Sequence, residues 1–231
     1  MEPKLTIIIP VLNESKYIDN LLRRLLQSSD IRFIQIIVVD GGSQDDTVAL
    51  AKKYPIEIYT CSQQSRASQM NYGAKYAKAN ILYFVHADTL PPLSFYQDIL
   101  TAIEQGNNFG FFRQKFDSKK LALLINSFFT RFNFLLNRGG DQSMYISKEL
   151  FEKLNGFDEK YVIMEEYNLM DRAEEFSSRF VIPKYTIVSD RKYDRCSWIK
   201  VQLANFHAMK MYKQACDPRL IKSEYIRRLG I

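Results

Sequence analysis

The stretches that decide the fold are LTIIIPVLNE at residues 5–14, IQIIVVDGGSQDD at 34–46 and ILYFVHAD at 81–88. Each begins with a mostly apolar run, continuous or interrupted by a single polar residue such as Gln35, and ends in polar or acidic residues. Such runs are typical of strands that are buried on both faces of a parallel sheet. Apolar residues between the first two runs recur at helical spacing: Ile18, Leu21, Leu22, Leu25 and Leu26. The sequence therefore predicts an α/β fold with a mostly parallel sheet flanked by helices.

Weaker patterns extend this alternation along the chain. We expect a short strand at Ile56–Tyr59, and we expect Asn13 or Ser15 to cap the first helix and Ser43 the second. Apolar periodicity predicts one further strand, at Val181–Val188 around Pro183. The remaining helices are predicted at a small-residue face formed by Ala67, Met70, Ala74 and Ala77, and at Phe95–Glu104, Lys148–Leu154, Glu165–Phe176 and Ser197–Lys213.

Composition bounds the class of protein. The chain has 231 residues, 46% of them hydrophobic, and too few Pro and Gly for a fibrous or disordered protein. The net charge of +6 suits an anionic partner without selecting one, and because the charge is dispersed we expect no nucleic-acid partner. The longest stretch without Asp, Glu, Lys or Arg is ten residues, Leu121–Thr130, which is too short to span a bilayer.

The cysteines and the N-terminal residues bear on location. The three cysteines form no CxxC pair, so neither a disulfide framework nor a zinc site is predicted. The first residues lead directly into a strand-like segment and contain no apolar signal-peptide core. We therefore expect a cytoplasmic protein with reduced thiols.

Polar residues gather where the predicted strands end. Ligands of open parallel sheets bind beyond the carboxyl ends of the strands. Asn13 and Glu14 follow the first strand, Asp40 the second and Asp88 the fourth. The dinucleotide and P-loop glycine patterns are absent from the sequence. Asp40 with the two glycines after it is suited to hold a base or ribose, although an aspartate in this position is also a common turn former.

The same blocks carry a family resemblance. TIIIPVLNES at 6–15, VVDGGSQDDT at 38–47, RASQMNYGA at 66–74 and FVHADT at 84–89 resemble family 2 glycosyltransferases, which have the GT-A fold. The later blocks GGDQS, MEEYNL and RKYD are similar to a subgroup of small bacterial glycosyltransferases associated with arsenosugar biosynthesis. The resemblance runs from about Leu5 to Tyr225. It implies a single domain over 1–231, with a nucleotide-binding half at 1–90, an acceptor and catalytic half at 91–195 and a helical extension at 196–231.

The resemblance also implies a donor site. The expected nucleotide-sugar contacts are Pro10, Asn13, Glu14, Asp40, Gly41, Gly42, Arg66, Asn71, Asp88, Gly140, Arg191 and Lys192. His86 and Asp88 stand where the family has its D-x-D motif, so Mn²⁺ or Mg²⁺ is the expected cofactor, with Asp88 as ligand. His86 departs from that motif, and orienting Asp88 or a phosphate is an alternative role for it.

The acidic pair Glu165–Glu166 aligns with the family's catalytic pair, so Glu166 is the expected general base. Adjacent helical side chains diverge by about 100°, so only one of the two can point at the acceptor. Glu165 would share a face with Arg172 and either pair with it or meet the acceptor from the side, whereas Glu166 would lie in a smaller apolar surround. A capping role at the helix start is the alternative for both acids. Asp141 is expected to bind sugar hydroxyls, or else to be part of a turn.

These features predict transfer of a sugar, with inversion, from a nucleotide-diphosphate sugar to an unidentified hydroxyl acceptor. A nucleotidyltransferase would need a Gly-rich basic loop after the first strand, which the sequence lacks. A non-catalytic nucleotide-sugar binder or membrane-associated protein with a degenerate site stays open because His86 and Glu166 depart from the family. The Leu/Phe segment Lys119–Arg138 and the helix Ser197–Lys213 are expected to pack onto the fold; a dimer contact or peripheral membrane contact is the alternative.

Overall fold

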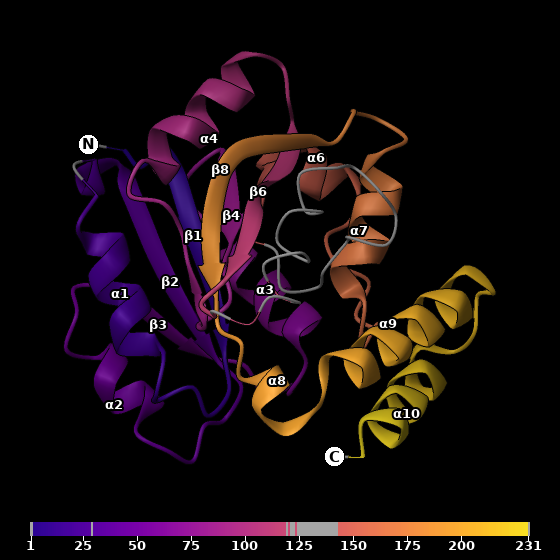
Figure 1. The fold of residues 1–231 in the computed structure, drawn as a ribbon. Coiled ribbons are helices and arrows are strands. Elements are labelled where there is room, and N and C mark those ends of the chain that lie inside the picture. The colour runs from indigo at the N-terminus through magenta and orange to yellow at the C-terminus, as the bar shows by residue number, and fades with distance from the viewer. Residues whose placement is uncertain (1, 29, 119, 121–122, 124–142, 231) are drawn as a thin grey trace.

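The protein is described by a computed structural model that covers residues 2–28, 30–118, 120, 123 and 143–230. A single twisted sheet runs through its centre, with helices on both faces (Figure 1). The strands are β1 (Leu5–Val11), β2 (Ile34–Asp40), β3 (Glu57–Thr60), β4 (Ile81–Phe84), β5 (Thr89–Leu90), β6 (Phe109–Phe116), β7 (Met144–Ser147) and β8 (Phe180–Val188). The helices are α1 (Ile18–Leu26), α2 (Thr47–Ala51), α3 (Arg66–Lys75), α4 (Phe95–Glu104), α6 (Lys148–Lys153), α7 (Glu165–Ala173), α8 (Lys192–Arg195), α9 (Trp198–Lys213) and α10 (Pro218–Leu229).

The strand order is β3-β2-β1-β4-β7-β6-β8-β5. The pairs β3-β2, β2-β1, β1-β4 and β6-β8 are parallel, whereas β7 runs antiparallel to both β4 and β6, and β5 runs antiparallel to β8. The predicted α/β fold with a mostly parallel sheet is therefore confirmed. Strands from both halves of the chain share this one sheet, although the boundaries of the predicted halves stay a prediction.

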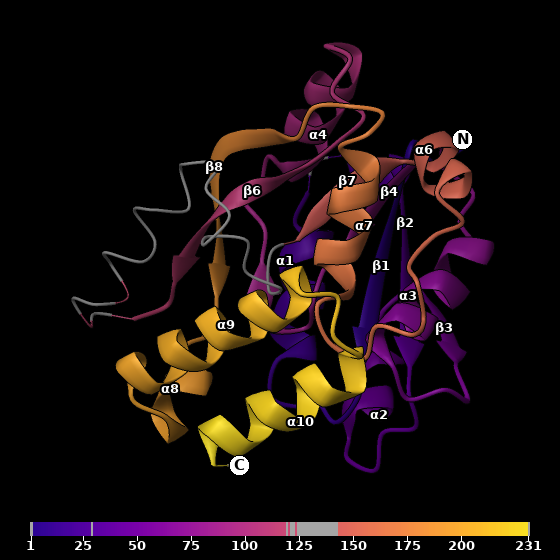
Figure 2. The same cartoon turned by 90° about the vertical axis from the view of Figure 1, so that its right-hand side faces the viewer.

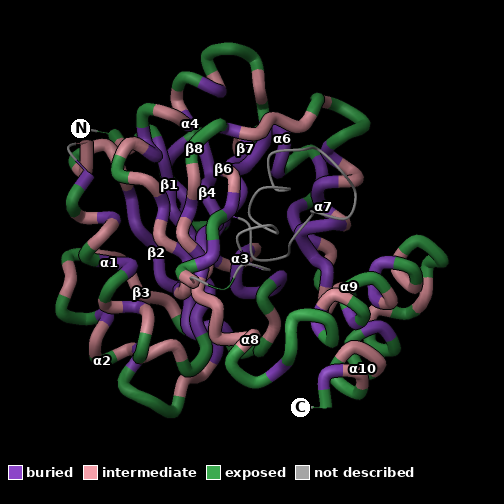
Figure 3. The backbone as a smooth tube through the Cα atoms, viewed as in Figure 1, coloured by how far each residue is buried: buried purple, intermediate pink, exposed green. Residues whose placement is uncertain are grey.

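Alternating side chains of β1 explain why both faces of the sheet are covered. Ile7 and Ile9 pack with α1, α2 and α4, whereas Ile8 packs with α3, α6 and α7. All three side chains are fully buried, and Figure 3 shows the buried strands between helices that are buried in part and exposed in part. Burial on both faces is the reason that β1 reads as a continuous apolar run.

Sequence patterns and structure differ at several element ends. Ser43 does not cap α2, and neither Asn13 nor Ser15 caps α1, which begins after Tyr17 without a side-chain cap. Helices α6 and α9 begin with serine caps that were not predicted: the hydroxyls of Ser147 and Ser197 each accept a hydrogen bond from a backbone N–H of the first turn. The three strands β5, β6 and β7 were not predicted.

Strand β8 contains the predicted Pro183. Its register with β6 jumps from Ile182, paired with Phe112, to Tyr185, paired with Arg113. The skipped residues place the proline in an irregularity of the ladder, where its missing N–H is tolerated. Strand β6 approaches β8 closely, since a Cβ on Gly110 would lie 2.2 Å from the carbonyl oxygen of Phe180.

The chain's last helices form a hairpin beside the sheet. Helices α9 and α10 pack side by side through Val201, Ala204 and Leu229, and Figure 2 shows them together below α7. Tyr212 on α9 donates a hydrogen bond of 2.7 Å to Asp171 on α7 and so ties the hairpin to the body. Among the helices of the described ranges, none is long and apolar enough to cross a bilayer.

Candidate active site

A large cavity lies at the carboxyl edge of β1 and β4. Its volume is about 1300 Å³. The described residues in its wall come from the β1–α1 loop, the segment after β4, the start of α7, the segment after β8, and the α9–α10 hairpin. A cavity at this edge is the expected binding place in an open α/β sheet, and its volume suits a ligand of nucleotide-sugar size.

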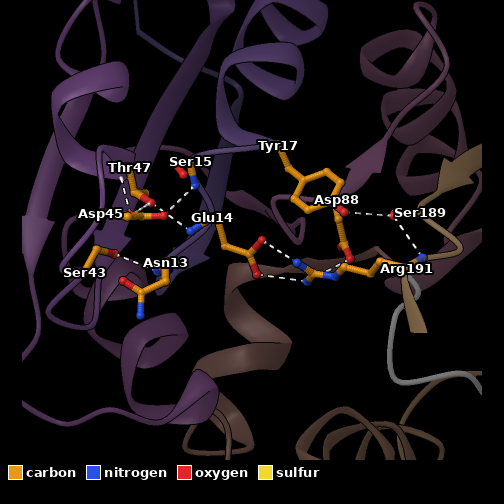
Figure 4. Close-up of polar contacts among 10 residues, drawn as sticks. All are labelled: Asn13, Glu14, Ser15, Tyr17, Ser43, Asp45, Thr47, Asp88, Ser189 and Arg191. Atoms are coloured by element: carbon orange, nitrogen blue, oxygen red, sulfur yellow. Dashed lines mark hydrogen bonds and ion pairs between the residues drawn. The ribbon is translucent and has the colours of Figure 1, made fainter. Parts of the chain in front are cut away.

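The loop after β1 is held by the loop after β2. The backbone N–H groups of Glu14 and Ser15 donate hydrogen bonds to Thr47 Oγ1 and Asp45 Oδ2, at 2.8 and 3.1 Å. Asn13, whose φ is 55°, accepts a hydrogen bond of 2.8 Å from the backbone of Gln44. Figure 4 shows the contacts of Glu14 and Ser15 with Thr47 and Asp45 beside the Glu14 side chain. They fix the backbone from which Glu14 reaches into the cavity.

The Arg191 guanidinium joins two acids in the cavity. It donates two hydrogen bonds to Glu14, of 2.7 and 2.9 Å, and lies 2.9 Å from Asp88 Oδ2 (Figure 4). The Tyr17 ring lies beneath it, 4.8 Å from the guanidinium carbon. Burial opposes the charge of Arg191, but the hydrogen bond with Glu14 and the charge of Asp88 raise its pKa overall. The group is therefore a fixed positive charge between two carboxylates.

The acidic pair at the start of α7 makes separate contacts. Oε1 of Glu166 lies 2.9 Å from His86 Nε2, and both side chains are nearly buried. Oε1 of Glu165 lies 3.9 Å from a guanidinium nitrogen of Arg66. Burial, together with the charge of Glu166, raises the pKa of Glu165 to about 7, although the charges of Arg66 and His86 oppose this shift. The two carboxyls thus have different partners, as the helical divergence predicted.

Several predicted residues are brought together. Pro10, Asn13, Glu14, Arg66, His86, Asp88, Glu165, Glu166, Arg191 and Lys192 all line the cavity. The Nζ atom of Lys192 also lies 5.0 Å from the centre of the Tyr225 ring on α10. The roles assigned to these residues stay predictions, but their common location is what those roles require.

Asp40 is placed differently from its predicted position against the base. Its side chain is buried and accepts hydrogen bonds from the backbone of Gly42, at 3.0 Å, and from the backbone and hydroxyl of Ser43. Of the described residues in the cavity wall, none is Asp40, Gly41 or Gly42. The alternative role of a turn former therefore describes Asp40 in this structure.

Asn71 also lies away from the cavity. Its side-chain amide donates to Phe157 O and its Oδ1 accepts from Phe157 N, both at 2.9 Å. It therefore joins α3 to the loop after α6 instead of facing a nucleotide. The predicted pairing of Glu165 with Arg172 is likewise wrong, because Arg172 bonds to Asn168 and to the carbonyls of the same loop. Gly140 and Asp141 lie outside the described residues, as does nearly all of Lys119–Arg138.

Comparison with known proteins decides the family. The model of glycosyl transferase family 2 matches residues 6–157, which is more than half of the chain. The chain belongs to glycosyltransferase family 2. A curated relative from Haemophilus influenzae, described as an uncharacterized glycosyltransferase, is 25% identical over 181 residues, which are 72% of this chain and 60% of the relative. The chain thus spans less than two thirds of that relative's length.

Several solved structures share the fold of this family member. The first 349 residues of TarS from S. aureus, in complex with UDP-GlcNAc, superpose with a TM-score of 0.67 at 17% identity, over 81% of this chain and 59% of that one. A mannosyltransferase from Pyrobaculum calidifontis, with GDP-Man and Mn²⁺ bound, gives 0.69 at 16% identity, over 93% and 65%. The GT-A fold that the sequence predicted is therefore confirmed.

The donor groups of this glycosyltransferase fit a cation that is shared with a substrate. Among the described residues, no group of three or more His, Cys, Asp or Glu side chains is arranged to hold a metal alone. Asp88 presents a hard carboxylate to the cavity, whereas His86 Nε2 is directed at Glu166. Mg²⁺ commonly binds through one or two carboxylates plus substrate phosphates. Asp88 therefore fits such a cation, while coordination by His86 would require its contact with Glu166 to be given up.

Two further residues shape the site and were missed from the sequence. The buried amide of Gln69 donates to Val11 O and Val39 O, both at 2.8 Å, and so holds the ends of β1 and β2 together. Tyr17 supports Arg191 through its ring. A glutamine on an apolar helix face is a sequence signal for a buried side chain that hydrogen-bonds two other segments. The partner of Tyr17, Arg191, lies 174 positions later, so no pattern in the sequence around Tyr17 indicates their contact.

The raised pKa of Glu165 predicts a pH-dependent stability. Between about pH 4.5 and pH 7 the folded protein keeps a proton that the unfolded chain has released. The stability from this group is therefore fully present at low pH and lost as pH rises to about 7. As pH rises from about 4.5 to about 7, we expect the free energy of unfolding of Glu165→Gln to increase relative to that of the wild type. The total increase should be on the order of 3 kcal/mol.

Denaturant titrations at a series of pH values measure this difference. The exposed Glu104 is the matched control, because Glu104→Gln removes a carboxylate without a buried environment. Parallel pH profiles for Glu165→Gln and the wild type would contradict the raised pKa.

Proposed function

We propose that this family 2 glycosyltransferase moves a sugar from a nucleotide-diphosphate sugar to a hydroxyl acceptor, with inversion at the anomeric carbon. The observation that supports the proposal is that Arg191, Asp88 and the acidic pair of α7 all line the same cavity. Direct displacement requires a positive group that binds the diphosphate, which Arg191 can provide, and a carboxylate base, which the acidic pair can provide. The glycosyltransferases of similar fold, in complex with UDP-GlcNAc and GDP-Man, support the class of donor.

In the proposed reaction the acceptor oxygen forms a bond to the anomeric carbon while the bond to the diphosphate breaks. The acceptor's proton passes to Glu166, and the electron pair of the broken bond stays on the diphosphate oxygen. His86, 2.9 Å from Glu166, orients the carboxylate. Arg191 and Lys192 stabilise the charge that develops on the departing diphosphate. No covalent intermediate with the protein is needed.

A divalent cation is part of the proposal. Asp88 would hold it, and when bound it would supply further positive charge to the diphosphate. Mn²⁺ is present in the mannosyltransferase structure and in a glucosyl-3-phosphoglycerate synthase from Mycobacterium tuberculosis that matches at a TM-score of 0.57. Those ions are properties of those proteins; for this chain the cation is a proposal.

A donor screen tests the function. Thermal unfolding is measured with UDP-, GDP- and dTDP-sugars, each with and without Mn²⁺. A donor at about 100 times its Kd stabilises the folded protein by about 2.7 kcal/mol. We expect one class of donor to stabilise the protein. We also expect the protein to hydrolyse that donor or to transfer its sugar. Binding without turnover across an acceptor panel would favour the non-catalytic binder instead, and no stabilisation by any donor would contradict both.

We further propose that the chain is a bacterial, cytoplasmic member of the arsenosugar-associated subgroup. The blocks GGDQS, MEEYNL and RKYD support the subgroup, and the reduced cysteines suit the location. The acceptor is not identified by these features. An acceptor panel that includes arsenic-containing and arsenic-free hydroxyl compounds would distinguish the subgroup from other members of the family.

A further inference from the structure

Helix α9 carries apolar side chains on two faces. Val201, Ala204 and Ala208 form the buried face. Ile199, Leu203 and Phe206 form a second stripe, at spacings of four and three residues, and are 65%, 61% and 58% exposed. We call these three residues the exposed stripe. The sequence-based expectation that this helix simply packs onto the fold is therefore correct for the first face only, because the body and α10 cover only that face.

Single exposed apolar residues are ordinary, but a run of large ones on one helix face indicates a contact surface. The stripe continues in basic residues. Lys210 and Lys213 follow Phe206 at spacings of four and three, and both are exposed. Apolar residues flanked by lysines on one face are typical of helices that lie in a membrane interface, where long lysine stems reach the headgroups.

Charged residues are dispersed along the sequence, but most of their net positive excess lies at this hairpin. Residues 196–231 carry seven Lys and Arg against two Asp and Glu, a net charge of +5 out of +6. Within the described residues, Glu224 pairs with Arg227 and Arg228. Lys210 and Lys213 form no ion pair with a described residue, and both are exposed, so their charge is available to an external partner.

We propose that the exposed stripe and its flanking lysines dock onto an anionic membrane surface. Charge complementarity selects this occupant over a second copy of the chain. A symmetric dimer through the stripe would bring two hairpins of charge +5 together. An anionic bilayer instead gains about fivefold in affinity for each Lys or Arg near its surface.

Docking at this place has a consequence for the cavity. Trp198 and Phe206 are partly exposed and also belong to the cavity wall. The docked hairpin would therefore hold the cavity next to the bilayer surface. The inference goes beyond the proposed reaction and holds whether or not the chain transfers a sugar.

Vesicle flotation of the full chain tests the proposal. The probes are vesicles of equal parts phosphatidylglycerol and phosphatidylcholine, and vesicles of phosphatidylcholine alone. We expect the chain to float with the anionic vesicles at low salt, to be released as salt is raised, and to stay unbound with phosphatidylcholine. Failure to bind anionic vesicles at low salt overturns the proposal.

Two variants locate the contact. Lys210→Gln with Lys213→Gln should lower the partition coefficient about 25-fold, and Ile199→Ser with Leu203→Ser should lower it about tenfold or more. All four residues are exposed, and none lines the cavity. The controls are Lys52→Gln with Lys53→Gln, and Leu93→Ser with Phe176→Ser, in which the apolar residues are 49% and 51% exposed but lie outside the hairpin.

We expect the control variants to bind like the wild type. Equal losses in the control and hairpin variants would overturn the assignment of the surface. Sedimentation velocity tests whether a second copy of the chain covers the stripe instead. A wild-type dimer that becomes a monomer in the Ile199→Ser, Leu203→Ser variant, together with no vesicle binding, would show that it does. Unchanged thermal unfolding of each variant confirms that its fold is intact.

Discussion

Replacing Glu166 with glutamine is expected to lower the rate of sugar transfer about 10²–10⁴-fold while donor binding is retained. The acceptor hydroxyl is a weak nucleophile near neutral pH, so its proton must be removed as the new bond forms. An amide of the same shape cannot accept that proton. Transfer rates and donor affinity, measured on the same variant, separate the loss of chemistry from the loss of binding.

The neighbouring acid provides the control. Glu165→Gln changes the same group one residue earlier, where the partner is Arg66 instead of His86. We expect Glu165→Gln to keep most of the turnover, and His86→Gln to reduce it less than Glu166→Gln because the base itself remains. If Glu165→Gln loses turnover and Glu166→Gln does not, the general base has been placed one residue too late. If neither does, the pair has a structural role at the start of α7.

The second large effect is expected at Asp88. Asp88→Asn should remove the increase in donor affinity that Mn²⁺ produces, because the amide oxygen carries no charge for the cation. Calorimetric titration of the donor, with and without Mn²⁺, measures this increase directly. In the wild type a cation at Asp88 would have to compete with Arg191, which lies 2.9 Å from Asp88 Oδ2.

Glu14 offers a matched control for Asp88. Both acids pair with Arg191, so both Glu14→Gln and Asp88→Asn release its guanidinium. If Asp88 serves only to hold Arg191, the two variants should behave alike. If Asp88 binds the cation, Glu14→Gln should weaken donor binding equally with and without Mn²⁺, and only Asp88→Asn should abolish the difference between the two conditions.

The parts of the fold that were predictable are those whose signal is local. Strands β1, β2 and β4 are buried on both faces, so each one reads as an apolar run of its own. Strand β7 has only four residues, and β6 ends in the polar sequence RQK before Phe116. Both are stabilised by pairing with each other and with distant strands. The pattern of apolar residues within each strand does not indicate that pairing.

The candidate site shows the same division. Sequence position placed Asp88 and Glu14 at one edge of the sheet, the family resemblance added Glu166 on a helix, and the structure brings all three to one cavity. It did not show that Asp40 turns its carboxylate into its own loop, because a turn former and a ligand contact occupy the same position after a strand. Nor did helical spacing show which apolar face of α9 remains uncovered, since that depends on what packs against it.

The ion pair between Glu14 and Arg191 joins residues 177 positions apart. During synthesis Glu14 emerges early, whereas Arg191 emerges only when most of the chain has been made. Contacts of such high sequence separation close late, because the entropy of a long loop is lost before they form. The loops after β1 and β2 can therefore form their mutual hydrogen bonds while the chain is still on the ribosome. The cavity acquires the positive charge of Arg191 only after β8 has joined the sheet. A nascent or truncated chain without β8 would lack this donor site even if its first strands were folded, so the capacity to bind donor marks completion of the fold.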